Sequence, residues 1–205
     1  MIKFLFQGDS ITDAGRERGN DSSFGYGYPN LFAAEVLKNR PYEFDFVNRG
    51  ISGNRIVDVY ARMKIDIINL KPDYMSLLIG VNDVWHEFGS HNGVAVEKFE
   101  KIYSMLIEEI KEELPEIKLI LLEPFVLLGA GTEEHYDEFR AEVIKRAEAV
   151  KRIAEKYNLK FVPLQAKFDE AAAGGNDTYW LADGVHPTPA GHCLIKDELM
   201  KAFIE

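Results

Sequence analysis

The sequence predicts an α/β fold, in which a five-stranded parallel sheet carries helices on both of its faces. Short apolar segments alternate five times with longer segments whose apolar residues recur at helical spacing, an order typical of parallel sheets. The chain has 205 residues, of which 46% are hydrophobic and 28% are charged, so it can bury a full core. It contains no internal repeat, low-complexity tract or linker, and we therefore expect one domain over residues 1–205.

The predicted strands are short apolar segments bounded by turn-forming residues. The first begins almost at the N-terminus, and each of the others follows a segment with helical periodicity. The five strands are expected over residues 2–7, 44–48, 74–79, 117–122 and 160–163.

Helices are predicted where apolar residues recur every three or four positions. Pro29 stands in the first turn of one of them, where a missing N–H is tolerated, and Pro115 ends another. The helices are expected over residues 29–38, 56–70, 96–114, 133–157, 167–173 and 189–204.

The remaining polar and glycine-rich segments are predicted to be loops over residues 12–27, 49–54, 80–93 and 124–132. The carboxyl ends of parallel strands meet at one edge of a sheet, where open α/β folds bind their ligands. Reactive side chains that follow different strands are therefore expected to lie together.

The segment Gly8-Asp9-Ser10-Ile11-Thr12 follows the first predicted strand directly. Gly8 allows a sharp turn, and the Asp9 carboxylate can accept backbone N–H groups within it. Ser10 would then present its hydroxyl at the sheet edge, as a nucleophile requires. The alternative is an ordinary strand-to-helix turn in which Ser10 or Thr12 caps a helix.

Three other segments supply groups suited to acyl transfer. Gly53 has no side chain, so its N–H can approach a substrate closely, and Asn82 carries a neutral amide donor. His186 is a natural base near neutral pH, and Asp183 stands three residues before it. With Ser10 as nucleophile, these residues would supply a base, an orienting carboxylate and an oxyanion hole formed by Ser10, Gly53 and Asn82.

These segments, taken in order, resemble the SGNH or GDSL hydrolase family. Gly-Asp-Ser, an isolated Gly, Gly-x-Asn-Asp and Asp-x-x-His follow one another between Gly8 and His186. Ile11 stands where the family name has Leu, an apolar exchange that affects packing only. The resemblance implies a three-layer, flavodoxin-like sandwich and ester hydrolysis by a serine, without a metal or another cofactor.

The longer motifs resemble the intracellular acetylxylan-esterase branch, which removes acetyl groups from xylo-oligosaccharides. They span residues 8–13, 48–54, 80–85 and 186–192. Related sequences act on other acyl esters, so a short-chain acyl esterase, a thioesterase and a lysophospholipase stay open as alternatives.

Four residues next to these motifs are candidates for substrate binding. Trp85 and Trp180 could stack on sugar rings; packing is favoured for each taken alone, but their placement beside two of the motifs favours the site for the pair, and a non-catalytic carbohydrate-binding protein would use them in the same way. Asp9 could contact substrate or orient His186, but stabilising its own turn is favoured. Arg55 could contact substrate, but an ion pair with an acidic residue is favoured.

The formal net charge of −10 argues against nucleic acid and anionic membranes as partners. A single cysteine, Cys193, rules out an intrachain disulfide, and no leader-like segment precedes the first strand, so a cytoplasmic location is expected. The histidines lack the spacing of a zinc site. The partner expected is a small acetylated sugar or oligosaccharide, and assembly into a homo-oligomer stays open.

Overall fold

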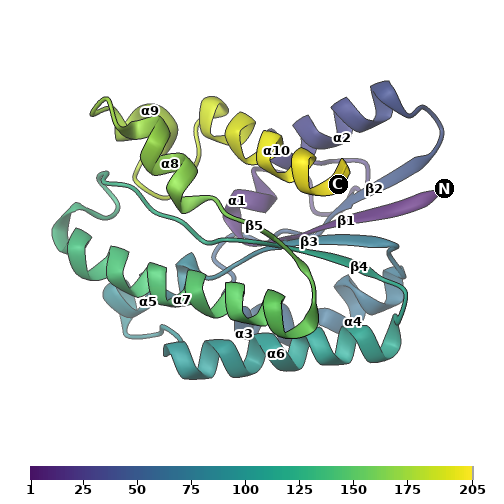
Figure 1. The fold of residues 1–205 in the computed structure, drawn as a ribbon, viewed down its shortest axis with the longest axis horizontal. Helices are drawn as coiled ribbons and strands as arrows, with labels where there is room; N and C mark the ends of the chain where they lie inside the picture. Colours follow the sequence, from purple (N-terminus) through teal and green to yellow (C-terminus); the bar gives the residue numbers. More distant parts are fainter. Residues whose placement is uncertain (205) are drawn as a thin grey trace.

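A computed structural model describes residues 1–204 and contains a five-stranded sheet whose strands are all parallel (Figure 1). The strand order β2-β1-β3-β4-β5 is that of flavodoxin-like folds. The strands are β1 (Ile2–Gly8), β2 (Phe44–Asn48), β3 (Tyr74–Leu78), β4 (Lys118–Leu122) and β5 (Lys160–Val162). All five predicted strands are thereby confirmed, with bounds that differ by at most one residue at either end.

Helices cover both faces of the sheet, as the sequence predicts (Figure 1). One face carries α2 (Tyr28–Asn39), α8 (Gln165–Ala172), α9 (Asp177–Trp180) and α10 (Pro189–Ile204). The other carries α3 (Ile56–Ala61), α4 (Met63–Asp66), α6 (Val96–Glu113) and α7 (Tyr136–Tyr157). None of the helices among residues 1–204 has the length and apolar character needed to cross a membrane.

The core consists of two hydrophobic clusters, which receive alternate residues of the central strand β1. Successive residues of a strand point to opposite faces. Phe4 and Phe6 of β1 therefore join the cluster under α2 and α10, whereas Leu5 joins the cluster under α6 and α7. Phe32 of α2 packs edge-on against Phe6, with ring centroids 5.6 Å apart. A sheet covered on both faces explains why its strands are almost continuously apolar.

The prediction of a loop over residues 80–93 is wrong, because most of this segment forms helix α5 (Val81–Ser90). Val81, Val84, Trp85 and Phe88 stand at helical intervals, and Val81 and Val84 are buried in the core. Gly80 before the helix, Gly89 within it and Gly93 shortly after it obscured this period in the sequence. Asn82 and Trp85 consequently lie on a helix.

The single helix predicted over residues 56–70 is also wrong, because the chain breaks there into α3, α4 and the 3₁₀ turn η1 (Ile68–Leu70). The first break falls at Arg62, whose guanidinium donates to the Asn54 side chain at 2.7 Å and to the Gln7 side chain at 2.7 Å. These contacts draw the chain toward the sheet, an effect that apolar periodicity does not reveal. A 3₁₀ turn, η2 (Glu133–His135), likewise precedes α7.

Two very short helices have no counterpart among the predictions. Helix α1 (Ser10–Asp13) continues β1 directly, and α9 precedes the Asp183 loop. Helices of four residues are too short to give a periodic pattern.

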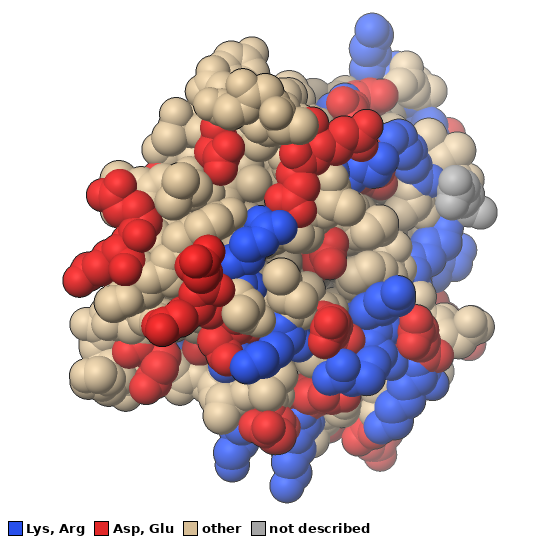
Figure 2. Space-filling view, turned by 60° about the vertical axis from the view of Figure 1, so that its left-hand side comes forward, with Lys and Arg blue, Asp and Glu red and all other residues tan. Residues whose placement is uncertain are grey.

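Figure 2 shows acidic side chains on the left of the face drawn and a mixture of acidic and basic side chains over its centre, bottom and right. Many charged side chains of the protein form pairs, such as Arg152 with Glu100 at 2.6 Å between α7 and α6. A surface of this kind has no basic stripe on the face shown that would follow a phosphate backbone.

Candidate active site

Ser10 occupies the first position of α1, at the carboxyl end of β1. The preceding residue, Asp9, caps this helix, since its side chain accepts the Ile11 N–H at 3.0 Å. The alternative role of Ser10 or Thr12 as the cap is therefore excluded. The Ser10 hydroxyl instead lies 2.9 Å from Nε2 of His186.

His186 is joined on its other side to Asp183. Nδ1 of His186 lies 2.7 Å from one carboxylate oxygen of Asp183. The other oxygen accepts the backbone N–H groups of Val185 at 2.9 Å and of His186 at 2.8 Å. Serine, histidine and aspartate thus form one continuous hydrogen-bonded series, as the sequence predicts.

The pKa values of this pair follow from that geometry. Burial raises the pKa of Asp183, but hydrogen bonds from the side chain and backbone of His186 outweigh it and lower that pKa to about 2. The hydrogen bond from Asp183 raises the pKa of His186 above its ordinary value. The pair therefore favours an ionised carboxylate that stabilises a proton on the imidazole.

A loop that the sequence analysis did not connect with the site holds Asp183 in place. After β4, the N–H of Leu127 donates to the Gly184 carbonyl at 2.9 Å, and the N–H of Gly131 donates to the Asp183 carbonyl at 2.8 Å. A side chain at Gly129 would collide with the backbone of Asp183, so this loop lies directly against the triad loop. The closely spaced pair Gly129 and Gly131 is the sequence feature that could have indicated such an approach.

The candidate oxyanion donors lie at the same sheet edge. Gly53 has a φ of +81°, a left-handed conformation suited to glycine, and a Cβ there would meet no atom within 4 Å. Asn82 stands in the first turn of α5, and its amide donates one hydrogen to the Asn54 carbonyl at 3.1 Å. The second amide hydrogen remains for a substrate oxygen, and the positive end of the helix dipole favours negative charge here.

Asp9 is not a substrate contact, which corrects one of the predictions. Asp9 is only 1% exposed and lies beneath the turn that carries Ser10. One of its carboxylate oxygens has no hydrogen-bond partner among the described residues. Burial raises its pKa to about 7, opposed by the Ile11 hydrogen bond and by His186. A carboxyl group in this position stabilises the turn, which is the role that the sequence favoured.

Arg55 forms the ion pair that the sequence favoured over a substrate contact. Its guanidinium lies 2.9 Å from the Asp58 carboxylate and donates to the Asn92 carbonyl at 2.7 Å. The side chain is thereby occupied between α3 and the segment after α5, and it does not line the cavity beside Ser10.

The two tryptophans differ in their relation to the site. The Trp85 ring centroid lies 5.6 Å from that of His186, so Trp85 stands beside the triad. The indole N–H of Trp180 instead donates to the Ala171 carbonyl at 3.0 Å, and Trp180 does not line the Ser10 cavity. Trp85 is therefore placed beside the triad, whereas the Trp180 indole is engaged by α8, and a sugar-stacking role stays a prediction.

A cavity of about 300 Å³ opens beside the Ser10 hydroxyl. Tyr26 lies at this cavity and is 72% exposed. The lining residues are Ser10, Ile11, Ala14, Gly15, Tyr26, Ser52, His186, Pro187 and His192. A larger cavity of about 520 Å³ lies at the amino ends of β3, β4 and β5, on the edge opposite the triad.

A serine, a histidine and an aspartate joined in series at the carboxyl edge of a parallel α/β sheet define a serine-hydrolase type of site. The chain belongs to the GDSL-like lipase/acylhydrolase family, which it matches over residues 6–194. Membership of this family, together with the relatives described next, makes the protein an esterase.

The relatives are similar over nearly their whole length. An acetylxylan esterase of Geobacillus stearothermophilus is 36% identical, covering 98% of this chain and 92% of the relative. A crystal structure of the acetylxylan esterase Axe2 from that organism has a TM-score of 0.88 at 34% identity, covering 98% of this chain and 93% of that one. A GDSL-like lipase structure from Parabacteroides merdae reaches a TM-score of 0.93 at 36% identity, covering 98% and 94%.

Proposed function

We propose that this esterase hydrolyses O-acetyl esters of carbohydrates, with acetylated xylo-oligosaccharides as the substrate class, through an acyl-enzyme on Ser10. One observation carries the proposal. The Ser10 hydroxyl lies 2.9 Å from Nε2 of His186, whose Nδ1 lies 2.7 Å from the Asp183 carboxylate. This arrangement makes Nε2 an acceptor for the serine proton at the moment of attack.

In the proposed reaction, Ser10 attacks the ester carbonyl carbon while His186 accepts the hydroxyl proton. His186 then donates that proton to the leaving sugar oxygen, and the acetyl group remains on Ser10. A water molecule, deprotonated by His186, attacks the acetyl carbonyl, and His186 then returns this proton to the Ser10 oxygen as the bond to the acetyl group breaks, which releases acetate and restores the Ser10 hydroxyl. Asp183 holds the imidazole in the required tautomer and stabilises its positive charge throughout.

The backbone N–H groups of Ser10 and Gly53 and the Asn82 amide would stabilise the oxyanion of both tetrahedral intermediates. Gly53 lies in the loop after β2, and Asn82 lies in the first turn of α5, which follows β3; β2 and β3 are the two neighbours of β1 in the sheet. Loss of one such donor typically costs about 3–4 kcal/mol of transition-state stabilisation.

Two further observations support the proposal, the first bearing on a small acyl group on a sugar and the second on the triad. The Ser10 cavity of about 300 Å³ is small, and aromatic rings of Tyr26 and Trp85 lie beside it or beside His186. The relatives described as acetylxylan esterases include catalytic mutants in which a serine, an aspartate and a histidine are each replaced by alanine. In that relative the aspartate precedes the histidine by three residues, as Asp183 precedes His186.

The test is a panel of p-nitrophenyl esters of rising chain length together with acetylated xylo-oligosaccharides. We expect kcat/KM to fall steeply from acetyl to octanoyl esters and acetate to be released from the oligosaccharides. Ser10→Ala should abolish both activities without unfolding the protein, because it removes a single hydroxyl. Turnover by purified Ser10→Ala at the wild-type rate would refute the mechanism.

The same panel separates the alternatives. A rise of kcat/KM with chain length would favour a lysophospholipase or thioesterase, and equal rates on simple and sugar acetates would favour a general short-chain esterase. Sugar binding without hydrolysis, and without labelling of Ser10 by an organophosphate, would identify a carbohydrate-binding protein. A cytoplasmic location, a single domain and a homo-oligomer stay predictions from the sequence.

A further inference from the structure

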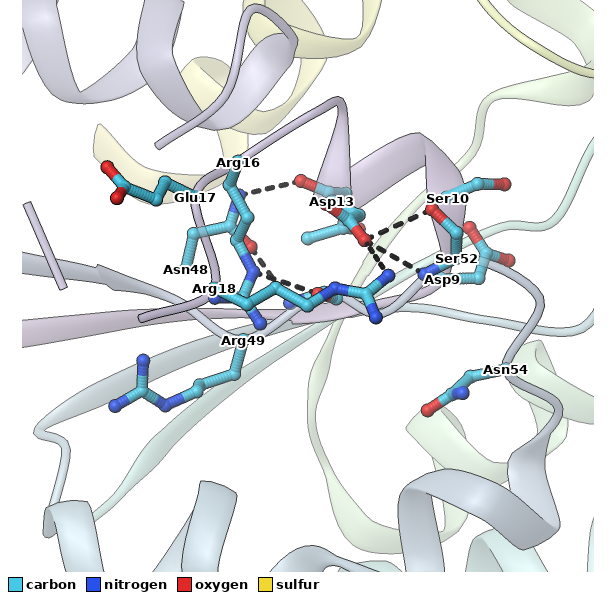
Figure 3. A network of polar contacts seen from close by, with 12 residues as sticks. Asp9, Ser10, Asp13, Arg16, Glu17, Arg18, Asn48, Arg49, Ser52 and Asn54 are labelled. Carbon is cyan, nitrogen blue, oxygen red and sulfur yellow. Dashed lines mark hydrogen bonds and ion pairs between the residues drawn. The ribbon is translucent and has the colours of Figure 1, made fainter. Parts of the chain in front are cut away.

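The loop that carries Gly53 is joined to the nucleophile helix by the carboxylate of Asp13. One oxygen of this carboxylate accepts the Ser52 N–H at 3.0 Å and the Ser52 hydroxyl at 3.0 Å. The same oxygen accepts a hydrogen bond from the Arg18 guanidinium at 2.7 Å. Asp13 is the last residue of α1, the helix that begins with Ser10, and Figure 3 shows it between Arg18 and Ser52.

The beginning of this loop is held separately. The Asn48 side chain donates to the Thr12 carbonyl at 2.7 Å and accepts the Gly50 N–H at 2.8 Å. The buried Arg16 donates to the Gly50 carbonyl at 2.9 Å. A Cβ at Gly50 would lie 2.4 Å from the Asp13 nitrogen, so the loop rests directly on α1 at this point.

Between Gly50 and Gly53, Asp13 is the side chain that holds the loop, whereas Asn54, the residue after Gly53, is held by Arg62 and Asn82. Ile51 donates to the Gly8 carbonyl at 3.1 Å, and Ser52 donates twice to Asp13. The next residue, Gly53, has its Cα open to the surroundings. The Gly53 N–H belongs to the peptide plane that begins at the Ser52 Cα, so holding Ser52 by both its N–H and its hydroxyl restricts the direction of the Gly53 N–H.

A carboxylate suits this position better than a neutral group. Ser52 presents two donors and Arg18 a third, and an ionised oxygen accepts charge-assisted hydrogen bonds about twice as strong as neutral ones. Burial raises the pKa of Asp13, but the bonds from Arg18 and Ser52 outweigh burial and keep that pKa below its ordinary value.

We propose that Asp13 is a positioning residue for the oxyanion hole, whose carboxylate holds Ser52 and thereby aims the Gly53 N–H at the reacting carbonyl. The proposal rests on the proposed esterase mechanism with Ser10 as nucleophile. Preorganised donors act on the charge that develops in the transition state, so a misdirected donor lowers kcat more than it raises KM.

The test compares Asp13→Asn, Asp13→Ala and Ser52→Ala with wild type on one soluble acetyl ester. Removing an oxyanion donor costs about 10²–10³ in kcat, so misdirecting one should cost about 10–100-fold in Asp13→Ala. Asp13→Asn, which keeps an oxygen but loses the charge, should lose less, and Ser52→Ala, which keeps its N–H, should lose a few-fold. KM and the midpoint of the pH profile should stay near wild type in all three.

A double variant and a matched control make the result specific. If Asp13 acts through Ser52, the two substitutions should not be independent. The fold-loss of kcat in the double variant Asp13→Asn with Ser52→Ala should then be measurably smaller than the product of the two single fold-losses. Asp21→Asn removes a carboxylate from an exposed pair with Arg49, and kcat should not change. Effects that multiply fully would overturn the proposal, as would a lower melting temperature with an unchanged kcat in the Asp13 variants.

The experiment also separates this proposal from the esterase mechanism itself. Organophosphate should label Ser10 to the same final extent in wild type and in Asp13→Asn, because the nucleophile is intact in both. A wild-type protein that neither hydrolyses esters nor becomes labelled would refute the proposed function. A wild-type esterase whose Asp13 and Ser52 variants keep full kcat would refute only the role of Asp13.

Discussion

At the scale of single residues, the Asp183 carboxylate has two different tasks on its two oxygens. One oxygen faces Nδ1 of His186, and the other accepts two backbone N–H groups of its own loop. The second task fixes the rotation of the carboxylate, so the first oxygen has a defined direction. This arrangement makes the effect of an amide substitution predictable.

Asp183→Asn should lower kcat strongly and move the pH profile. The amide oxygen should keep the backbone N–H groups, which leaves the NH₂ facing Nδ1 and favours the tautomer with its proton on Nε2. Nε2 then cannot accept the Ser10 proton, and the serine-protease template gives a loss of about 10⁴-fold in kcat. Wild-type kcat/KM should rise with pH through an ionisation above 6.5, because Asp183 raises the pKa of His186.

In the variant this ionisation should move to lower pH, since the imidazolium has lost its charged partner. The measurement is kcat/KM against pH for both proteins on the same soluble acetyl ester. Asp9→Asn is the comparison variant, because the Asp9 carboxyl group also raises the pKa of His186. If Asp9→Asn caused the loss and Asp183→Asn did not, Asp9 would be the orienting residue.

The sequence predicted the contacts among the triad residues better than it predicted the burial and the hydrogen-bond partners of the residues next to them. Ser10, His186 and Asp183 could be paired because residue type and strand position restrict the chemistry. Asp9, Arg55 and Trp180 were candidates for substrate binding because they adjoin those motifs. Adjacency in the chain does not reveal burial or a competing partner, and it was burial for Asp9 and local partners for the other two that decided their roles.

At the scale of elements, helix α5 depends on an unusual conformation at its first turn. Gly80 precedes the helix with a φ of +136°, and a Cβ there would lie 3.2 Å from the Pro124 ring. This turn aims the beginning of α5, and with it Asn82, at the edge of the sheet. The sequence around Gly80 and Gly89 looked like a loop because it is rich in glycine. Only Gly80 needs glycine for its backbone conformation, whereas Gly89 lies within the helix and does not.

The same substitution at these two glycines should change stability with opposite signs. Gly80→Ala should destabilise the protein by about 1–3 kcal/mol, because alanine rarely adopts that backbone conformation. Gly89→Ala should stabilise it by about 0.5–1 kcal/mol, since Gly89 lies within α5, is exposed and has room for a Cβ. Urea denaturation at one pH measures both, and equal signs would contradict this account of α5.

At the scale of the whole molecule, strand order explains why distant segments form one site. Strand β1 lies between β2 and β3, so the loops after these three strands open side by side at the switch point of the sheet. Ser10, Gly53 and Asn82 follow those strands in turn. Alternation of strands and helices predicted the layers, but the order of strands came from the family resemblance, because crossover connections of either direction give the same alternation.

Two buried groups, His192 and Asp9, should contribute to the pH dependence of the free energy of unfolding in opposite directions. Burial, assisted by His186, lowers the pKa of His192 to about 4, below its ordinary value of 6.5. Stability due to His192 is therefore complete above pH 6.5 and is lost as the pH falls toward 4. Burial raises the pKa of Asp9 from 3.8 to about 7, so its effect is the reverse, and stability is lost as the pH rises between those values.

Two variants should separate these opposing contributions. Each unit of pH over which one proton is bound differently changes the unfolding free energy by about 1.4 kcal/mol. Relative to His192→Gln, wild type should therefore gain about 3 kcal/mol between pH 4 and 6.5. Relative to Asp9→Asn, it should lose about 4 kcal/mol between pH 4 and 7. Urea denaturation across this range measures both, and because packing losses in either variant do not depend on pH, they cancel from the slopes. Parallel stability curves for wild type and a variant would mean that burial does not control the proton on that residue.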